Sequence, residues 1–298
     1  MSQPPPAPPS RPRRVPLRRR PAWAWLRLFR PVALLTGVGV ALGAAFTLDN
    51  GSPAWHEALA VAIVMAGLLA AASAFNDAED AEFDRDAHVW RPIPAGFVTV
   101  PQAQRAAAAW ALTALIAAAT LGWIPFLLVL ATVALAYLHS ARLKPGNFAW
   151  LAWALAFALV PLWIAEGVDA FDRVLWWAFP VGMTAGLAMY LTVKLPDYER
   201  DDSDDAHNLL HWLTIDYAVP VAWGAVGAHI VMAVASANLE SLRAEWIIPA
   251  ASVAIVLALV MMGILFFGVT ERRLVWQRWV LSLAIVGMEI GWLGSIIP

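Results

Sequence analysis

The sequence predicts an all-α, polytopic membrane protein of nine transmembrane helices with its N-terminus in the cytoplasm. The chain of 298 residues is 61% hydrophobic and only 14% charged, and its mean hydropathy is +0.65. A soluble domain of this length has no need for so much apolar sequence, whereas membrane spans require long apolar runs. Nine such runs follow a basic N-terminal region. They cover residues 31–47, 58–75, 106–121, 124–138, 148–165, 174–193, 217–234, 246–269 and 279–297.

These runs have the length and pattern of helices. Strands of an outer-membrane barrel would be about ten residues long and would alternate apolar with polar residues, and these runs do neither. Several runs are shorter than the roughly 20 residues that a straight span needs. Runs 106–121 and 124–138 are separated only by Gly122 and Trp123, which predicts a tight helical hairpin.

The basic residues predict the orientation of the chain. With the N-terminus in the cytoplasm, 18 of the 20 lysines and arginines fall in cytoplasmic segments, and only Arg173 and Arg243 fall in outer loops. Because short loops rich in positive charge stay in the cytoplasm, this distribution favours an odd number of spans. We therefore expect a multi-pass protein of the cell (inner or plasma) membrane, embedded in the lipid bilayer.

Residues 1–22 form a region separate from the membrane domain predicted for residues 23–298. They are rich in proline and arginine and cannot bury apolar surface, which predicts a disordered tail. A cleaved signal peptide is disfavoured, because Arg27 and Arg30 interrupt the approach to the first apolar run. The absence of cysteine excludes disulfides, thiolate metal sites and a cysteine nucleophile. We expect no nucleic-acid partner, and the oligomeric state stays open.

Two short stretches, 76–86 and 197–205, hold 12 of the 22 acidic residues. Each stretch follows an apolar run, the second and the sixth, on the predicted cytoplasmic side. Carboxylates are costly at the edge of a lipid-facing bundle and therefore mark functional sites. The alternative is a solvated acidic loop, and this alternative is stronger for the second stretch than for the first.

The spacing inside both stretches suits a hard cation. Asn76, Asp80 and Asp84 are spaced i, i+4, i+8 and would share one face of a helix, and Asp197 and Asp201 repeat the i, i+4 spacing. Amide and carboxylate oxygens without histidine or cysteine favour Mg²⁺, which combines one or two carboxylates with phosphate oxygens. Two acidic patches that face each other across Mg²⁺ would hold a diphosphate.

A diphosphate between carboxylates also needs cations. Four basic residues lie in predicted cytoplasmic loops near the acidic stretches: Arg91, Arg142, Lys144 and Lys194. They could simply satisfy the positive-inside bias, and for Arg142 the two explanations are equally strong. We favour a functional role for Lys144 and Lys194, because the chain uses arginine at every other basic position.

Four segments carry a resemblance to a known family. NDAEDAEFDRDAHVWRPIPAG (76–96) resembles the first signature of UbiA-type intramembrane prenyltransferases, an NDxxDxxxD box followed by RPxxxG. DYERD (197–201) resembles their second box, DxxxD. YLHSARLK (137–144) resembles their tyrosine-to-lysine loop, and LRLFRPVALLTG (26–37) resembles their opening Arg-Pro segment.

The resemblance implies a UbiA-like prenyltransferase bundle and a set of site residues. It implies Mg²⁺ and diphosphate ligands at five positions: Asn76, Asp80, Asp84, Asp197 and Asp201. It implies that Lys144 acts with Tyr137 and Arg30 to steady the diphosphate of an isoprenyl donor. A lipophilic or aromatic acceptor would then take the isoprenyl group. Asp77 belongs to the motif but lies off the metal-facing side, so we expect it to support the site or face the acceptor.

The short gap before RPIP is closest to chlorophyll-synthase-like and geranylgeranylglyceryl-phosphate-geranylgeranyltransferase-like members, which favours a geranylgeranyl or similar donor. The second box departs from the family pattern, because Asp205-Ala206-His207-Asn208-Leu209 stands where many members have glycine and a basic residue. A non-catalytic isoprenoid-binding scaffold is therefore the alternative function. A cation transporter is less favoured, because the acids lie in loops and not at the bilayer midplane.

Overall fold

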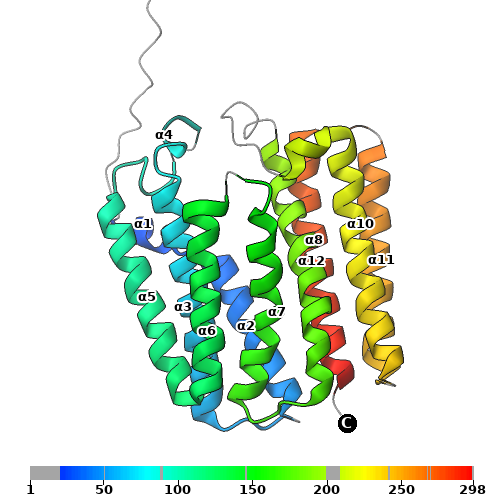
Figure 1. The fold of residues 1–298 in the computed structure, drawn as a ribbon. Coiled ribbons are helices and arrows are strands. Elements are labelled where there is room, and N and C mark those ends of the chain that lie inside the picture. Colours follow the sequence, from blue (N-terminus) through cyan, green and yellow to red (C-terminus); the bar gives the residue numbers. More distant parts are fainter. Residues whose placement is uncertain are drawn as a thin grey trace, which may run out of the picture.

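Every regular element in the described part of the chain is helical, as Figure 1 shows. The structure is a computed structural model that describes residues 21–49, 51–87, 90–144, 146–198, 209–240, 242–266, 268 and 270–296. The helices are α1 (Pro21–Leu28), α2 (Pro31–Leu48), α3 (Trp55–Glu79), α4 (Asp84–Ala87), α5 (Val100–Leu121), α6 (Trp123–Leu138), the π-helical turn η1 (His139–Leu143), α7 (Ala149–Gly167), the 3₁₀ turn η2 (Arg173–Trp177), α8 (Ala178–Lys194), the 3₁₀ turn η3 (Leu195–Asp197), α10 (Leu209–Leu239), α11 (Ala244–Phe266) and α12 (Glu271–Ile296).

The prediction of an all-α membrane protein is confirmed. Each of the nine apolar runs falls mainly on one long helix, although run 174–193 begins in η2 before it enters α8. Eight of the described helices are long and apolar enough to cross a membrane. The long helix outside those eight is α8, which has 17 residues. The count of nine spans and the side of the membrane on which the N-terminus lies therefore remain predictions. The predicted tail, residues 1–22, lies almost wholly outside the described residues.

Several helices begin earlier than the apolar runs that predict them. α5 begins six residues before run 106–121, because Thr99 caps it: the Thr99 hydroxyl accepts from Gln102 N, and the Gln102 side chain accepts from Thr99 N at 2.8 Å. α12 likewise begins eight residues before run 279–297, at Glu271. Because the first turns of these helices are polar, the apolar run begins later in the sequence than the helix does.

The predicted hairpin between α5 and α6 is confirmed. α5 ends at Leu121 and α6 begins at Trp123, so Gly122 alone turns the chain. Gly122 has φ +133°, a backbone conformation that residues with a Cβ rarely adopt.

Small residues set the distance between α7 and α8. A Cβ on Gly182 would lie 2.6 Å from the Ala158 Cα, and a Cβ on Gly186 would lie 2.6 Å from the Ala154 Cα. Membrane helices pack this closely where glycine and alanine let their backbones meet. The contact fixes α8 against α7. It thereby fixes the end of α8, which carries Lys194, beside the beginning of α7.

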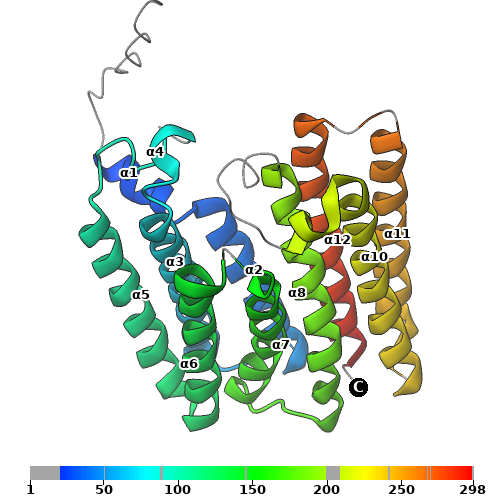
Figure 2. The same ribbon diagram turned by 45° about the horizontal axis from the view of Figure 1, so that its top comes forward.

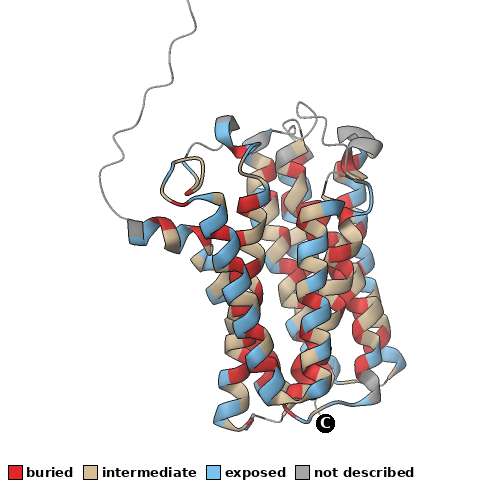
Figure 3. Ribbon diagram, turned by 60° about the vertical axis from the view of Figure 1, so that its left-hand side comes forward, coloured by how far each residue is buried: buried red, intermediate tan, exposed pale blue. Residues whose placement is uncertain are grey.

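The helix bundle has a polar end and an apolar outer surface. The ends of α3, α6 and α8 that lead into α4, η1 and η3 lie together at one end of the bundle, opposite the C-terminus (Figures 1 and 2). Buried residues line the helix contacts, while exposed positions face outwards along the helices (Figure 3). Many outward residues are apolar, such as Leu35, Ile116 and Leu283, each at least 60% exposed. This surface is suited to lipid.

Candidate active site

The three residues of the first acidic box stack at the end of α3. Asp80 N donates to Asn76 O at 2.9 Å, and Asp84 N donates to Asp80 O at 2.8 Å, so helical hydrogen bonding continues past Glu79 into α4. The Asn76 side-chain amide donates to Asp80 Oδ2 at 2.9 Å. The i, i+4, i+8 spacing therefore places these side chains in one row, as the sequence predicts.

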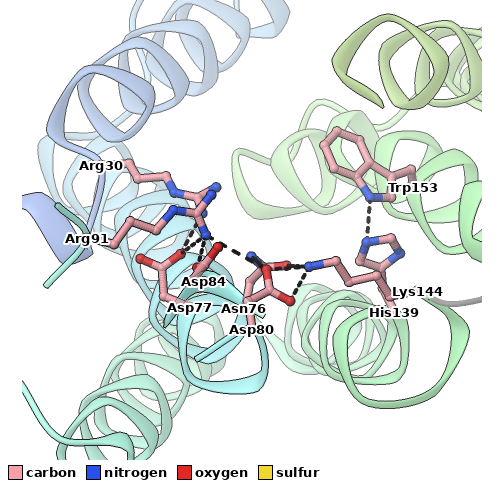
Figure 4. A network of polar contacts seen from close by, with 9 residues as sticks. All are labelled: Arg30, Asn76, Asp77, Asp80, Asp84, Arg91, His139, Lys144 and Trp153. Atoms are coloured by element: carbon pink, nitrogen blue, oxygen red, sulfur yellow. Dashed lines mark hydrogen bonds and ion pairs between the residues drawn. The ribbon is translucent and has the colours of Figure 1, made fainter. Parts of the chain in front are cut away.

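Lys144 reaches this row from the turn after η1. Its Nζ donates to both carboxylate oxygens of Asp80 and lies 3.3 Å from Asn76 Oδ1, as Figure 4 shows. Burial lowers the pKa of Lys144, and the Asp80 carboxylate beside it raises that pKa. The positive charge of Lys194, at the end of α8, lowers the pKa of Lys144 further. Charged groups at the ends of α3 and α8 therefore both act on the Lys144 ammonium.

Two arginines bind the other side of the row (Figure 4). Arg91 Nη1 donates to Asp84 Oδ2 and also lies 3.7 Å from Asp77 Oδ1 and 4.0 Å from Asp80 Oδ2. Arg30 Nη2, from the junction of α1 and α2, donates to Asp77 Oδ1 at 2.7 Å. Asp77 therefore faces arginines, while Lys144 contacts Asn76 and Asp80.

The remaining predicted cations and Tyr137 differ in their exposure and surroundings. Arg142 is exposed on η1. Lys194 is half-buried at the end of α8. Tyr137 is 57% exposed, and its ring centroid lies 4.7 Å from that of Phe75. Both rings line a pocket of about 190 Å³ between α3, α5 and α6.

The second acidic box is only partly visible. The backbone of Asp197 ends η3, which packs against α8, α10 and α12. The Asp197 side chain and all of Asp201 lie outside the described residues. Whether the two boxes share a metal therefore remains a prediction. Within the described residues, no group of three His, Asp or Glu side chains forms a metal site by itself.

The oxygen donors of the first box fit Mg²⁺. The Lys144 ammonium is already bound by one amide oxygen and one carboxylate, which are ligand types that a hard cation takes. Among the described residues, the side-chain oxygen atoms of Asn76 and Asp80 face this point, and Mg²⁺ prefers few protein ligands together with phosphate oxygens. The chemistry of these residues therefore agrees with the magnesium prediction.

Sequence reasoning missed a histidine in this region. His139 begins η1 and lies between Ala149 and Trp153 of α7, with hydrogen bonds to both. Its position two residues after Tyr137 and five before Lys144 was the available signal. Hydropathy cannot distinguish such a residue from an ordinary histidine at the membrane surface.

Comparisons with known proteins agree with this fold and site. The profile of the UbiA prenyltransferase family matches residues 37–285. Digeranylgeranylglyceryl phosphate synthase of Pyrococcus horikoshii is 28% identical over 188 residues, which cover 62% of this chain and 67% of that protein. The 4-hydroxybenzoate octaprenyltransferase of Pseudoalteromonas atlantica is 27% identical over 185 residues, which cover 60% of this chain and 64% of that protein. The matches thus span about two thirds of each relative.

Solved structures share the fold. The structure of a UbiA homolog from Archaeoglobus fulgidus bound to GPP and Mg²⁺ has a TM-score of 0.68 and 20% identity, and the match covers 90% of this chain and 99% of that one. The apo structure of a UbiA homolog from Aeropyrum pernix K1 has a TM-score of 0.72 and 15% identity, with coverage of 87% and 97%. The family profile covers most of the chain, and the fold is that of UbiA homologs. The chain therefore belongs to the UbiA prenyltransferase family, whose members are intramembrane prenyltransferases.

Proposed function

We propose that this protein transfers an isoprenyl group from its diphosphate to a lipophilic or aromatic acceptor, in a Mg²⁺-dependent reaction that releases pyrophosphate. The observation that carries the proposal is the charge cluster at the polar end of the apolar bundle. There, Asp80 meets Lys144 and Asp84 meets Arg91. A donor with an anionic head and a hydrocarbon tail matches this arrangement of charge and apolar surface.

The acidic residues would hold the metal. We assign Asn76, Asp80 and Asp84 from the first box and Asp197 and Asp201 from the second as its ligands. Bound Mg²⁺ would polarise diphosphate oxygens and neutralise charge on the leaving group. Carboxylates alone would repel a diphosphate. Bound Mg²⁺, together with the lysine and arginines beside the carboxylates, would offset this repulsion.

The basic residues would bind the diphosphate itself. Lys144 and Arg91 are held beside the carboxylates, where their N–H donors can also bind phosphate oxygens. Arg30 contributes through Asp77, which it contacts directly. We also assign Lys194 and Tyr137 to the diphosphate site, and Arg142 is the weakest candidate, because it is exposed. Fixed cations of this kind stabilise the charge that grows on pyrophosphate.

The reaction balances without a further reactant. The allylic C–O bond breaks, and its electron pair leaves with pyrophosphate. The allylic carbocation then accepts an electron pair from the acceptor, which forms the new bond and loses a proton. The helices around the site exclude water, which would otherwise capture the cation.

The substrates are the finer part of the proposal. We infer a geranylgeranyl or similar donor, supported by the form of the first box and by the similarity to a digeranylgeranylglyceryl phosphate synthase. The homolog structures bound to GPP and DMAPP with Mg²⁺ support an isoprenyl diphosphate as the donor class. We also propose that residues 23–298 form the catalytic domain, and that its site faces the cytoplasm of the cell membrane.

The test is pyrophosphate release in detergent or nanodiscs with geranylgeranyl diphosphate and Mg²⁺. Wild type should release pyrophosphate when a suitable acceptor is present, and Asp80→Ala should not. Glu82→Gln, an exposed change in the same acidic stretch, is the matched control. Mass spectrometry of co-purified lipids should identify an isoprenoid or its prenylated product.

Two other outcomes would overturn the proposal. Binding of prenyl diphosphates without turnover, over a broad set of acceptors, would indicate the non-catalytic scaffold. Divalent-cation flux in liposomes that persists in Asp80→Ala would indicate a transporter whose path avoids this site.

A further inference from the structure

Lys144 owes its direction to an irregularity in the helix that precedes it. α6 continues into the π-helical turn η1, and Lys144 N donates to His139 O at 2.8 Å across five residues. A π turn adds one residue to the helical repeat, so side chains after it are rotated by about 100° from the α-helical register. An uninterrupted α-helix would therefore direct Lys144 elsewhere.

His139, the first residue of this π turn, is bonded through both ring nitrogens. Its Nδ1 lies 3.1 Å from Ala149 O, at the start of α7. Its Nε2 accepts from the indole N–H of Trp153, one turn further along α7, at 3.2 Å. Figure 4 shows the histidine ring beside Trp153 and Lys144 on the adjoining turn. The two contacts tie both ends of the loop that carries Lys144.

These partners define one form of the imidazole. A carbonyl oxygen can only accept, so Nδ1 must carry the hydrogen. The indole N–H of Trp153 can only donate, so Nε2 must be the bare nitrogen. The ring is therefore the neutral Nδ1–H tautomer, and both of its hydrogen-bonding atoms are committed to α7. The Tyr190 ring, 6.4 Å from His139 and 6.2 Å from Trp153, packs against this pair from α8.

We propose that His139 is a positioning residue: clamped between Ala149 and Trp153, it holds η1 in its π-helical register and so keeps Lys144 Nζ against Asn76 and Asp80. The role of this clamp in prenyl transfer rests on the proposed function. Its effect on the placement of Lys144 does not.

Lys144 can be followed separately, because the chain has only two lysines, Lys144 and Lys194. Acetic anhydride at low extent of reaction, followed by peptide mass spectrometry, gives the acetylation rate at each. Trp153→Phe keeps an aromatic ring but removes the donor to His139 Nε2. We expect it to raise the rate at Lys144 about fivefold, the usual effect of losing one hydrogen bond, while the rate at Lys194 stays within twofold.

The matched control is Trp150→Phe, the same chemical change one turn earlier on α7. It should leave both acetylation rates unchanged. At position 139, an asparagine amide can replace the Nδ1–H contact and a glutamine amide can replace the Nε2 contact, whereas leucine can replace neither. His139→Leu should therefore release Lys144 most, and His139→Asn and His139→Gln should restore part of its protection.

Turnover gives a second readout that separates positioning from general loosening. Lys144→Met alone should lower kcat, and adding Trp153→Phe to Lys144→Met should lower it no further, because the clamp acts through Lys144. Additive losses in the double variant would overturn the proposal. So would unchanged acetylation of Lys144 in His139→Leu, or equal increases at both lysines. If wild type shows no prenyl transfer at all, the proposed function fails, while the acetylation rates still decide the role of His139.

Discussion

Arg30 and Asp77 lie 47 residues apart in the chain and are joined by a hydrogen bond of 2.7 Å. The Asp77 side chain is only 6% exposed, whereas that of Arg30 is 45% exposed. The pair ties the junction of α1 and α2 to the end of α3, next to the candidate metal ligands. Asp77 thus acts on the site by holding an arginine, which agrees with its place off the face of Asn76 and Asp80.

Replacement of Asp77 by asparagine should measure this tie. Asp77→Asn keeps the side-chain shape but removes the charge that pairs with Arg30 and lies near Arg91. We expect a loss of about 1–3 kcal/mol in the free energy of unfolding, between the values for exposed and buried ion pairs. Glu82→Gln should change stability by less than about 0.5 kcal/mol, because Glu82 is exposed. Equal thermal stability of the two variants in detergent would show that the pair contributes nothing.

The backbone of Arg30 allows a second, independent measurement. Arg30 has φ +50° and ψ +69°, in the left-handed region, immediately before Pro31. Arg30→Ala and Arg30→Gly both remove the side chain, but only glycine adopts this conformation without strain. We therefore expect Arg30→Gly to be more stable than Arg30→Ala by about 1 kcal/mol, measured by thermal unfolding. The opposite order would mean that the chain at position 30 relaxes to another conformation.

The site illustrates what sequence reasoning can and cannot reach. Local spacing predicted the row of Asn76, Asp80 and Asp84, because i, i+4 repeats depend only on helix geometry. Hydropathy predicted the long helices of the described part of the chain, because most of each one is a long and continuous apolar run. The partner of Arg30 could not be predicted, because it depends on how α1 and α2 pack on α3. The π turn at His139 was also unpredictable, since one inserted residue leaves no trace in composition.

A glycine pair tests the packing that fixes α8 beside α7. A Cβ on Gly186 would lie 2.6 Å from Trp153 O and from the Ala154 Cα, so Gly186→Ala must push the two helices apart. We expect it to lower the free energy of unfolding by about 1–3 kcal/mol. Gly227→Ala in α10 is the control, because a Cβ there has no neighbour within 4 Å. Removing a helical glycine should stabilise that variant by about 0.5–1 kcal/mol. Similar unfolding temperatures for both variants would refute close packing at Gly186.

Removal of divalent metal tests the oxygen-donor site. EDTA should abolish pyrophosphate release by the wild type, and added Mg²⁺ should restore it. Asp80→Asn removes the carboxylate that supplies two of the three oxygen atoms around Lys144 Nζ. We expect it to raise the Mg²⁺ concentration for half-maximal activity and to lower the maximal rate by about a hundredfold. A Mg²⁺ titration curve identical to that of wild type would exclude Asp80 as a ligand.

The orientation of the site can be read by chemical labelling, because the chain contains no cysteine. Ser52 lies in the connection between α2 and α3, Asn147 lies in the connection between η1 and α7, and both residues are exposed. These two connections lie at opposite ends of the bundle (Figure 1). The distribution of basic residues predicts that Asn147 and the charge cluster lie on the cytoplasmic side. In intact cells, a thiol reagent that cannot cross the membrane should therefore label Ser52→Cys but not Asn147→Cys. Inverted membrane vesicles should give the opposite result, and the wild type should stay unlabelled in both. Labelling of Asn147→Cys from outside the cell would place the candidate active site on the outer face, where a cytoplasmic prenyl diphosphate could not reach it directly.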